Sequence, residues 1–326
     1  MSDTKYINWG IMGCGTIAHK FAEDLCKIPT ALVYAVASRD LKKANDFGRL
    51  YNAYSCYGSY EELVKNTEVD VIYIATPHVF HYENTLLCLD HKKAVLCEKP
   101  FAMTIKQVRE MIRIAQKNQV FLMEALWTYF LPHYTYVLEI IASKKLGNVL
   151  HLKADFGFVS NSSPEERLFN KKLGGGSLLD VGIYPLFAAL TILGYPDQIQ
   201  AKAYFGDTGV DENCSVELSY KNGRKASLYS SITKKTKTEA IITLDQGKII
   251  VHSRFHEPSS VTIIKNETSE LLQFPVDTHG YSFEAVHVQQ MLTLHRTEST
   301  VMTFEKSLQL IALLDTIREK IGLYYE

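Results

Sequence analysis

Lys99, the residue best placed to do chemistry, directly follows a predicted buried strand. The apolar run Ala94–Cys97 is typical of a strand in a parallel sheet, and Glu98, Lys99 and Pro100 come next. In an open α/β sheet, ligands bind beyond the carboxyl ends of the strands, so Lys99 is where a ligand would lie. Pro100 ends the strand, and a cis peptide bond before it would fix the direction of the lysine. Taken alone, the pattern also fits a Glu/Lys pair at the surface.

A second pair of candidates lies in an apolar segment that follows three glycines. Asp180 and Tyr184 are four residues apart in a helix predicted to begin near Ser177, so we expect them to share one face. Burying an unpaired carboxylate is costly, so Asp180 needs a partner. Two roles are open for Asp180. It pairs with a backbone group or a lysine for structural reasons, or Asp180 and Tyr184 serve acid–base chemistry together with Lys99. We expect the second role.

The N-terminal segment contains a candidate dinucleotide-binding turn. A predicted strand, residues 6–12, leads through Gly13-Cys14-Gly15-Thr16-Ile17-Ala18 into a predicted helix, residues 19–27. In this G-x-G-x-x-A pattern the first glycine permits the turn, the second lets a pyrophosphate approach the backbone, and the small Ala18 allows close packing. Backbone N–H groups at the helix start would bind the phosphates. We predict cofactor contacts from Gly13, Gly15, Thr16 and Ile17.

The end of the second predicted strand, Ala31–Ala37, selects the cofactor. An acidic residue there would hold the ribose 2′-hydroxyl of NAD, whereas an arginine accommodates the 2′-phosphate of NADP. Ser38 and Arg39 come first and Asp40 one position later, so we predict NADP over NAD. Asp40 is left with two roles, as the ribose ligand or as the cap of a helix predicted over residues 41–51.

Other polar residues follow strands of the same predicted sheet. Thr76, His78 and His81 come after the buried strand Val69–Ala75 and are predicted to lie beside the nicotinamide or the substrate. Glu98 is expected either to anchor the strand end or to lie at the carboxamide side of the nicotinamide. The alternative is that one of the two histidines caps the helix that follows.

The order of predicted elements gives the fold class. Strands and helices alternate to about Ala125, which predicts an α/β Rossmann domain, a doubly wound parallel sheet, over residues 1–125. Residues 126–326 are predicted to form an α+β domain with a large open, mostly antiparallel sheet, because alternating strands dominate from Gln198 onward. Such a broad sheet face commonly meets a second subunit, so we expect a homodimer formed through it.

Composition excludes several other classes of protein. The chain has 326 residues, 46% hydrophobic, with a formal net charge of -1, so we expect neither nucleic acid nor a membrane as partner. The N-terminus lacks the pattern of a signal peptide, and the longest apolar stretch, residues 177–195, contains Asp180 and Pro185. Six cysteines without paired spacing predict a cytoplasmic protein with reduced thiols and no metal site.

Three motifs in this order resemble one known family. The segments Gly13–Ala18, Glu98–Pro100 and Gly174–Tyr184 are similar to the glucose–fructose oxidoreductase, inositol dehydrogenase and rhizopine-catabolism (Gfo/Idh/MocA) group, over nearly the whole chain. The segment Phe121–Thr128 resembles the subgroup of dimeric dihydrodiol dehydrogenases, which also act as NADP-dependent D-xylose dehydrogenases.

The resemblance implies an NADP-dependent enzyme that transfers hydride between the nicotinamide and a CH–OH or C=O group of a sugar, a cyclic polyol or a trans-dihydrodiol. Lys99 matches the family's catalytic lysine and Asp180 its aspartate, whereas many members carry histidine where this chain has Tyr184. Lys99 and Tyr184 are therefore both candidates for the proton donor. The alternatives are a reductase of keto- or dicarbonyl sugars and a non-catalytic regulator of the same fold. The implied substrate contacts are Trp127, Phe158, Tyr184 and Phe283.

Overall fold

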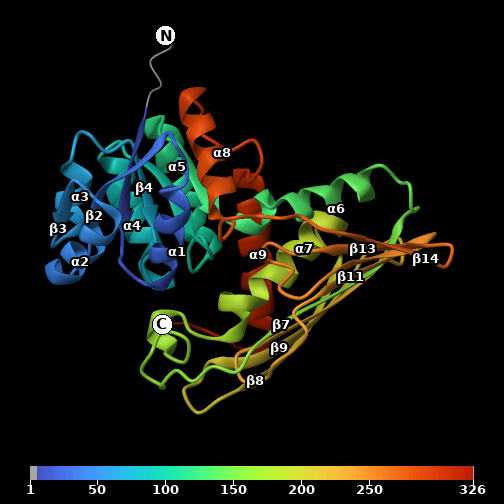
Figure 1. The fold of residues 1–326 in the computed structure, drawn as a ribbon. Coiled ribbons are helices and arrows are strands. Elements are labelled where there is room, and N and C mark those ends of the chain that lie inside the picture. Colours follow the sequence, from blue (N-terminus) through green and yellow to red (C-terminus); the bar gives the residue numbers. More distant parts are fainter. Residues whose placement is uncertain (1–5, 326) are drawn as a thin grey trace, which may run out of the picture. The chain divides into compact units, whose positions relative to one another are not determined.

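The computed structural model describes residues 6–325 and divides the chain into two compact units (Figure 1). The first unit comprises the described residues through Tyr129 together with Val276–Leu308, and the second comprises Phe130–Pro275 and the described residues from Gln309 onward. Each unit contains one sheet, of six strands in the first and eight in the second.

The sheet of the first unit is parallel throughout, with the order β3-β2-β1-β4-β5-β6. Its strands are β1 (Ile7–Met12), β2 (Ala31–Ala37), β3 (Ser55–Tyr57), β4 (Val71–Ile74), β5 (Ala94–Glu98) and β6 (Leu122–Ala125). The helices of the unit are α1 (Thr16–Leu25), α2 (Leu41–Tyr51), α3 (Tyr60–Lys65), η1 (His78–Phe80), α4 (His81–Asp90), α5 (Ile105–Asn118) and α8 (Tyr281–Thr293), with η2 (Trp127–Phe130) at the boundary between the units. The predicted doubly wound parallel sheet is confirmed, and β4, β5 and β6 all end at the same edge.

Local sequence signals account for where these helices begin. The hydroxyl of Ser59 accepts a hydrogen bond from the backbone N–H of Glu62 at the start of α3, and that of Thr104 accepts from Gln107 at the start of α5. The buried face of α5 consists of Val108, Met111, Ile112 and Ala115, which follow the helical period. This pairing of cap and apolar stripe is what made α5 predictable from sequence.

The segment Val276–Leu308 differs in placement from the predicted division, which assigned everything after residue 125 to the second domain. The buried carboxylate of Asp24 in α1 accepts the backbone N–H groups of His279, Gly280 and Ser282, at 2.7, 2.9 and 3.1 Å. These bonds satisfy the free N–H groups at the start of α8 and attach that helix to α1. The chain therefore returns to the first unit after completing the second sheet.

The sheet of the second unit has the order β14-β13-β12-β11-β7-β10-β9-β8, in which only β7 and β10 pair in parallel. Its strands are β7 (Val149–Gly157), β8 (Gln198–Phe205), β9 (Asp211–Ser219), β10 (Lys225–Ser231), β11 (Ala240–Leu244), β12 (Gly247–Val251), β13 (Val261–Lys265) and β14 (Thr268–Leu272). The mostly antiparallel sheet is confirmed. The edge strand β14 was not predicted, because its hairpin turns at Asn266 and Glu267, both at positive φ, without the glycine that marks such turns.

Helices of the second unit lie on one face of this sheet (Figure 1). They are α6 (Pro132–Ala142), the short turns η3 (Lys171–Leu173) and η4 (Leu178–Gly182), and α7 (Ile183–Leu193), while α9 (Phe304–Ile321) enters from the first unit. In β9, Cys214, Val216 and Leu218 are buried, whereas Ser215 and Glu217 on the other face are exposed. None of the described helices of this unit covers that other face.

The segment Lys171–Leu193 is long and apolar enough, by length and composition, to cross a membrane. However, 89% of its most apolar window is buried inside the protein, and α7 packs on β7 and β10. A core helix of a globular unit has these properties, and the segment also contains the predicted interruptions Asp180 and Pro185.

Candidate active site

The predicted strand–turn–helix is formed by β1, the glycine turn and α1. Gly13 has a φ of 96°, and a Cβ there would lie 3.0 Å from the carbonyl oxygen of Ala75, so only glycine suits the turn. A Cβ on Gly15 would meet open space, and Gly15 and Thr16 are exposed. The first turn of α1 contains no acidic side chain, and Gly15 supplies no side-chain cap. With Ile17 half-buried in the same turn, this open helix start fits a phosphate group.

The end of β2 resolves the two roles considered for Asp40. Its Oδ1 accepts the backbone N–H of Lys42 at 2.9 Å and of Lys43 at 3.3 Å, so the carboxylate caps α2. The hydroxyl of Ser38 accepts the N–H of Asp40 at 3.2 Å. Arg39 is exposed, and its guanidinium lies 5.3 Å from the ring centroid of Phe80. The side chain available to a ligand at this strand end is therefore cationic.

His81 ties the ends of β4 and β5 together. Its Nδ1 lies 2.8 Å from the carbonyl oxygen of Pro100 and its Nε2 2.8 Å from that of Thr76, and its ring is fully buried. The Lys99–Pro100 peptide bond is cis. His78 is 5% exposed, with its ring centroid 5.8 Å from that of His81. His81 thus serves the backbone around Lys99, and Thr76 and His78 lie beside it at the carboxyl edge of the sheet.

Glu98 is held by groups of the protein on both carboxylate oxygens. Oε1 accepts a hydrogen bond from the hydroxyl of Tyr73 in β4, and Oε2 accepts the backbone N–H of Lys99 at 3.2 Å. Burial, followed by the nearby charge of Glu98, raises the pKa of Tyr73 well above its usual value. Tyr73 therefore stays a neutral donor, and Glu98 anchors the end of β5 directly before the lysine.

In the second unit, Asp180 forms an ion pair that the sequence did not indicate. Its Oδ1 lies 2.9 Å from a guanidinium nitrogen of Arg167, and the two side chains are 13% and 40% exposed. Arg167 belongs to the irregular segment after β7, which reads in the sequence as a surface loop. The structural alternative considered for Asp180 was a backbone group or a lysine, and no sequence signal linked this arginine to Asp180.

The segment carrying Asp180 is not a plain α-helix. Residues Leu178–Gly182 form a π-helical turn that continues into α7, so Asp180 and Tyr184 do not follow simple α-helical spacing. The Tyr184 ring lies 4.8 Å from His256 and 5.8 Å from Phe156 between centroids, and Phe158 lies 6.2 Å from Phe156. Tyr184 and Phe158 therefore belong to one aromatic cluster, to which His256 adds a titratable ring that sequence reasoning missed.

A buried carboxyl positions this π-helical turn. Asp211 Oδ2 accepts the hydroxyl of Ser177 at 2.8 Å and the backbone N–H of Leu178 at 2.7 Å. Gly176 has a φ of 117°, and a Cβ there would come within 2.2 Å of Asp211 Oδ1, which explains the last glycine of the run. Burial raises the pKa of Asp211 to about 7, even though both donated hydrogen bonds favour its charged form.

The two aromatic candidates of the first unit are more enclosed than an open substrate wall. Trp127 is 4% exposed, and one face of its ring stacks on Tyr281 with centroids 4.2 Å apart and planes 8° apart. Phe283, on the same helix as Tyr281, is half-buried.

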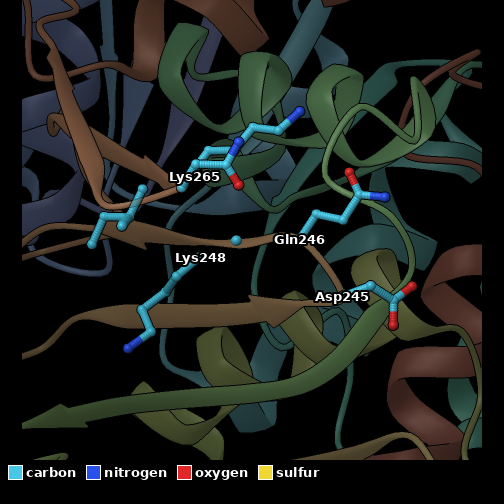
Figure 2. Close-up of a pocket in the computed structure, with 7 residues that line it drawn as sticks. Asp245, Gln246, Lys248 and Lys265 are labelled. Atoms are coloured by element: carbon cyan, nitrogen blue, oxygen red, sulfur yellow. The ribbon is translucent and has the colours of Figure 1, made fainter.

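A depression of about 680 Å³ in the second unit is distinct from all these residues. It lies between two hairpin turns and is lined by Asp245, Gln246, Gly247, Lys248, Ile264, Lys265 and Asn266. Figure 2 shows the amino group of Lys248 and the carboxylate of Asp245 directed away from each other. Because its polar groups do not converge, this depression has none of the features of a binding site.

The structure thus gathers the predicted residues into two groups. Gly13, Thr76, His81, Glu98 and Lys99 belong to the first unit, whereas Asp180, Tyr184 and Phe158 belong to the second. Among residues 6–325, no group of three or more His, Cys, Asp or Glu side chains could hold a metal ion.

This fold and these motifs define a class of protein. Residues 7–126 match the family model for the oxidoreductase family with an NAD-binding Rossmann fold, and residues 134–250 match that of the GFO/IDH/MocA C-terminal domain. The chain belongs to the Gfo/Idh/MocA family of oxidoreductases.

Individual relatives match along the whole chain. It is 38% identical to trans-1,2-dihydrobenzene-1,2-diol dehydrogenase of Xenopus laevis over 328 residues, 97% of this chain and 98% of the relative. The Danio rerio protein of the same name is 37% identical over 98% of each chain. The subgroup that the Phe121–Thr128 segment resembles is therefore the one the chain matches.

Two solved structures share the fold. KijD10, a 3-ketoreductase from Actinomadura kijaniata solved with NADP and TDP-benzene, has a TM-score of 0.88 at 23% identity and covers 97% of this chain and 98% of its own. The aldose-aldose oxidoreductase of Caulobacter crescentus, complexed with glycerol, has a TM-score of 0.89 at 20% identity over 98% of each chain.

The raised pKa of Asp211 predicts a pH-dependent stability. The pKa of Asp211 in the folded protein, about 7, exceeds that of an aspartic acid in an unfolded chain. The contribution of Asp211 to folding stability is therefore complete below about pH 4 and is lost as the pH rises through about 7. Between pH 4 and pH 7 the free energy of unfolding of the wild type should therefore fall by on the order of 2–4 kcal/mol relative to that of Asp211→Asn. Urea unfolding followed by circular dichroism measures this difference.

The matched control is Asp46→Asn, an exposed aspartate on α2. The difference in free energy of unfolding between Asp46→Asn and wild type should stay constant over the same range of pH. A constant difference for Asp211→Asn as well would contradict the assignment.

Proposed function

We propose that the protein is an NADP-dependent dehydrogenase of ring compounds bearing vicinal hydroxyls: trans-dihydrodiols, cyclic polyols or sugars. The observation that carries this is Lys99, fixed at the carboxyl edge of a dinucleotide-binding sheet in a chain 38% identical to dihydrodiol dehydrogenases. A non-catalytic regulator is not favoured, because Lys99, Asp180 and Tyr184 are all retained. Reduction of a keto sugar is the same chemistry in reverse, and its direction follows the cofactor ratio.

The preference for NADP follows from the end of β2. Asp40 caps α2, so its carboxylate is engaged by backbone N–H groups and does not serve a ribose hydroxyl. Ser38 and the exposed guanidinium of Arg39 would hold a 2′-phosphate, with the N-terminal turn of α1 holding the pyrophosphate. The fold relative KijD10 was solved with NADP bound, which supports the same choice.

The acid–base step is assigned to Lys99 together with Tyr184. When bound, the oxidised nicotinamide supplies the hydride acceptor at C4. Lys99 in its amine form accepts the hydroxyl proton of the substrate as the carbon loses hydride, so the alcohol loses one proton and one hydride and becomes a carbonyl. The hydroxyl of Tyr184 is the second group that can take or give this proton. Asp180, paired with Arg167, orients whichever of Lys99 and Tyr184 carries the proton.

The proposed substrate class rests on the aromatic side chains among the candidate residues of each unit. Phe158 and Tyr184 belong to the aromatic cluster of the second unit, and Trp127 and Phe283 are the corresponding candidates of the first. Aromatic rings suit the apolar face of a flat or puckered ring, and the acid–base groups select a hydroxyl at its edge.

We further propose a cytoplasmic homodimer formed through the uncovered face of the second sheet. On that face the register aligns Ile241 with Ile250, Ile250 with Thr262, and Thr262 with Leu271 in one row across four strands. A sheet face with such a row gains from burial against a second copy. The six cysteines are all free thiols, which fits a reducing compartment.

Arg39→Ala tests the cofactor. Loss of a charge-assisted contact to the 2′-phosphate should raise the Kd for NADPH by about 10- to 100-fold and leave that for NADH unchanged. Quenching of tryptophan fluorescence measures both constants. Arg49→Ala, which removes an arginine 81% exposed on α2, should change neither. Equal loss of both cofactors in Arg39→Ala would refute the 2′-phosphate contact.

Lys99→Met tests the acid–base assignment. Removing the amine should lower kcat/KM for trans-dihydrodiols, xylose and cyclic polyols by about 10²- to 10⁴-fold, while NADPH binding stays within about threefold of wild type. Steady-state absorbance assays with NADP follow the reaction, and Lys117→Met, an exposed lysine of α5, is the control. A Lys99→Met enzyme with full turnover would sink the assignment.

Ile250→Glu tests the dimer. A charge at the centre of the row should convert a particle of twice 37.0 kDa to one of 37.0 kDa in size-exclusion chromatography with light scattering. The control Leu50→Glu places the same charge on a leucine 62% exposed in the first unit and should leave the mass unchanged. A wild-type particle of 37.0 kDa would show that this face has no such role.

A further inference from the structure

Glu124 is a buried carboxyl that has no role in the function so far proposed. It lies in β6, is 2% exposed, and belongs to the segment Phe121–Thr128 that distinguishes the subgroup. The parallel register places it opposite Cys97, with Ala125 opposite Glu98. Glu124 therefore stands one strand away from the turn that carries Lys99.

Glu124 bonds directly to that turn. Its Oε1 accepts the backbone N–H of Phe101 at 3.0 Å. On the opposite side, His81 bonds the carbonyl oxygen of Pro100 at 2.8 Å. Pro100 has no N–H of its own. These two contacts, one from His81 at the start of α4 and one from Glu124 in β6, hold the carbonyl oxygen and the N–H of the single Pro100–Phe101 peptide group.

The charges around Glu124 come from the same turn. The ammonium of Lys99 favours the carboxylate form of Glu124, whereas the charge of Glu98 disfavours it. Burial is the largest influence and raises the pKa of Glu124 to about 7. Glu124 and Lys99 therefore each favour the charged form of the other.

We propose that Glu124 is a positioning residue for Lys99: it holds the turn that carries the lysine through the N–H of Phe101, and its carboxylate favours the charged form of Lys99. This inference rests on the proposed acid–base role of Lys99. In oxidation, the substrate hydroxyl proton passes to the Lys99 amine and forms an ammonium. A carboxylate at Glu124 stabilises that ammonium, so it promotes proton uptake and delays the return of the amine.

Two variants separate the hydrogen bond from the charge. Glu124→Gln retains an oxygen that can accept the Phe101 N–H but loses the negative charge. Glu124→Asp retains the charge on a side chain one methylene shorter, which does not reach Phe101 in the same geometry. A purely structural role would make both variants differ from wild type in stability alone.

The control is Glu284→Gln. Glu284 in α8 is fully buried, neither of its oxygens has a hydrogen-bond partner among the described residues, and the charges acting on it are those of Glu98 and Asp24. Burial raises its pKa well above the usual value, so glutamine replaces a group that is already neutral. We expect no change in its pH profile.

The experiment measures kcat/KM for oxidation against pH, with NADPH binding and circular dichroism as checks of folding. In Glu124→Gln the midpoint of the acidic limb should move to lower pH by about one unit, because the lysine gives up its proton more readily without the carboxylate. In Glu124→Asp the midpoint should stay, and kcat should fall about tenfold because the turn is less well held.

Failure of this inference and failure of the proposed function give different results. A Glu124→Gln profile that superimposes on wild type, with Lys99→Met inactive, would overturn this inference and leave the proposed function intact. Turnover by Lys99→Met would overturn the proposed function itself.

Discussion

The first unit depends on how the turn after β5 is held. A strand that ends in Lys99-Pro100 loses the backbone donor that would continue the ladder, because proline has no N–H. The next peptide group is held from both sides instead: His81, at the start of α4, bonds the carbonyl oxygen of Pro100, and Glu124, in β6, accepts the N–H of Phe101. These contacts depend on three parallel strands that end at one edge, which is what the order β4-β5-β6 provides. The reactive side chain is thereby carried by a fixed backbone.

The second unit uses the same physical device for its own candidates. Asp211 is buried and accepts the backbone N–H of Leu178 at the start of the segment that carries Asp180 and Tyr184. In both units a carboxyl with a pKa raised to about 7 bonds the backbone next to the candidate acid–base residues. A buried carboxyl with a raised pKa lowers folding stability at high pH. Such groups are found where the backbone needs an orienting contact. Local rigidity, rather than overall stability, is what these two positions provide.

The sequence predicted the elements whose signals are local. The bounds of β2 and α2 agree with the predicted ranges to the residue, because their signals, an apolar run and a capping residue, are local to each element. Contacts between distant segments were missed. The bond from Asp24 to Gly280 joins residues 256 apart, and the pairs Arg167–Asp180 and Glu124–Phe101 depend on the folded path of loops and strand ends. No periodicity in the chain encodes them.

The most direct test of the central claim, that Lys99 is held in place to exchange a proton with the substrate, is a crystal structure of the protein with NADP and an unreactive diol. The account predicts the Lys99 nitrogen within about 3 Å of one diol oxygen, with the Pro100–His81 and Phe101–Glu124 bonds retained. A diol whose hydroxyls contact other groups, with Lys99 directed away from them, would contradict it.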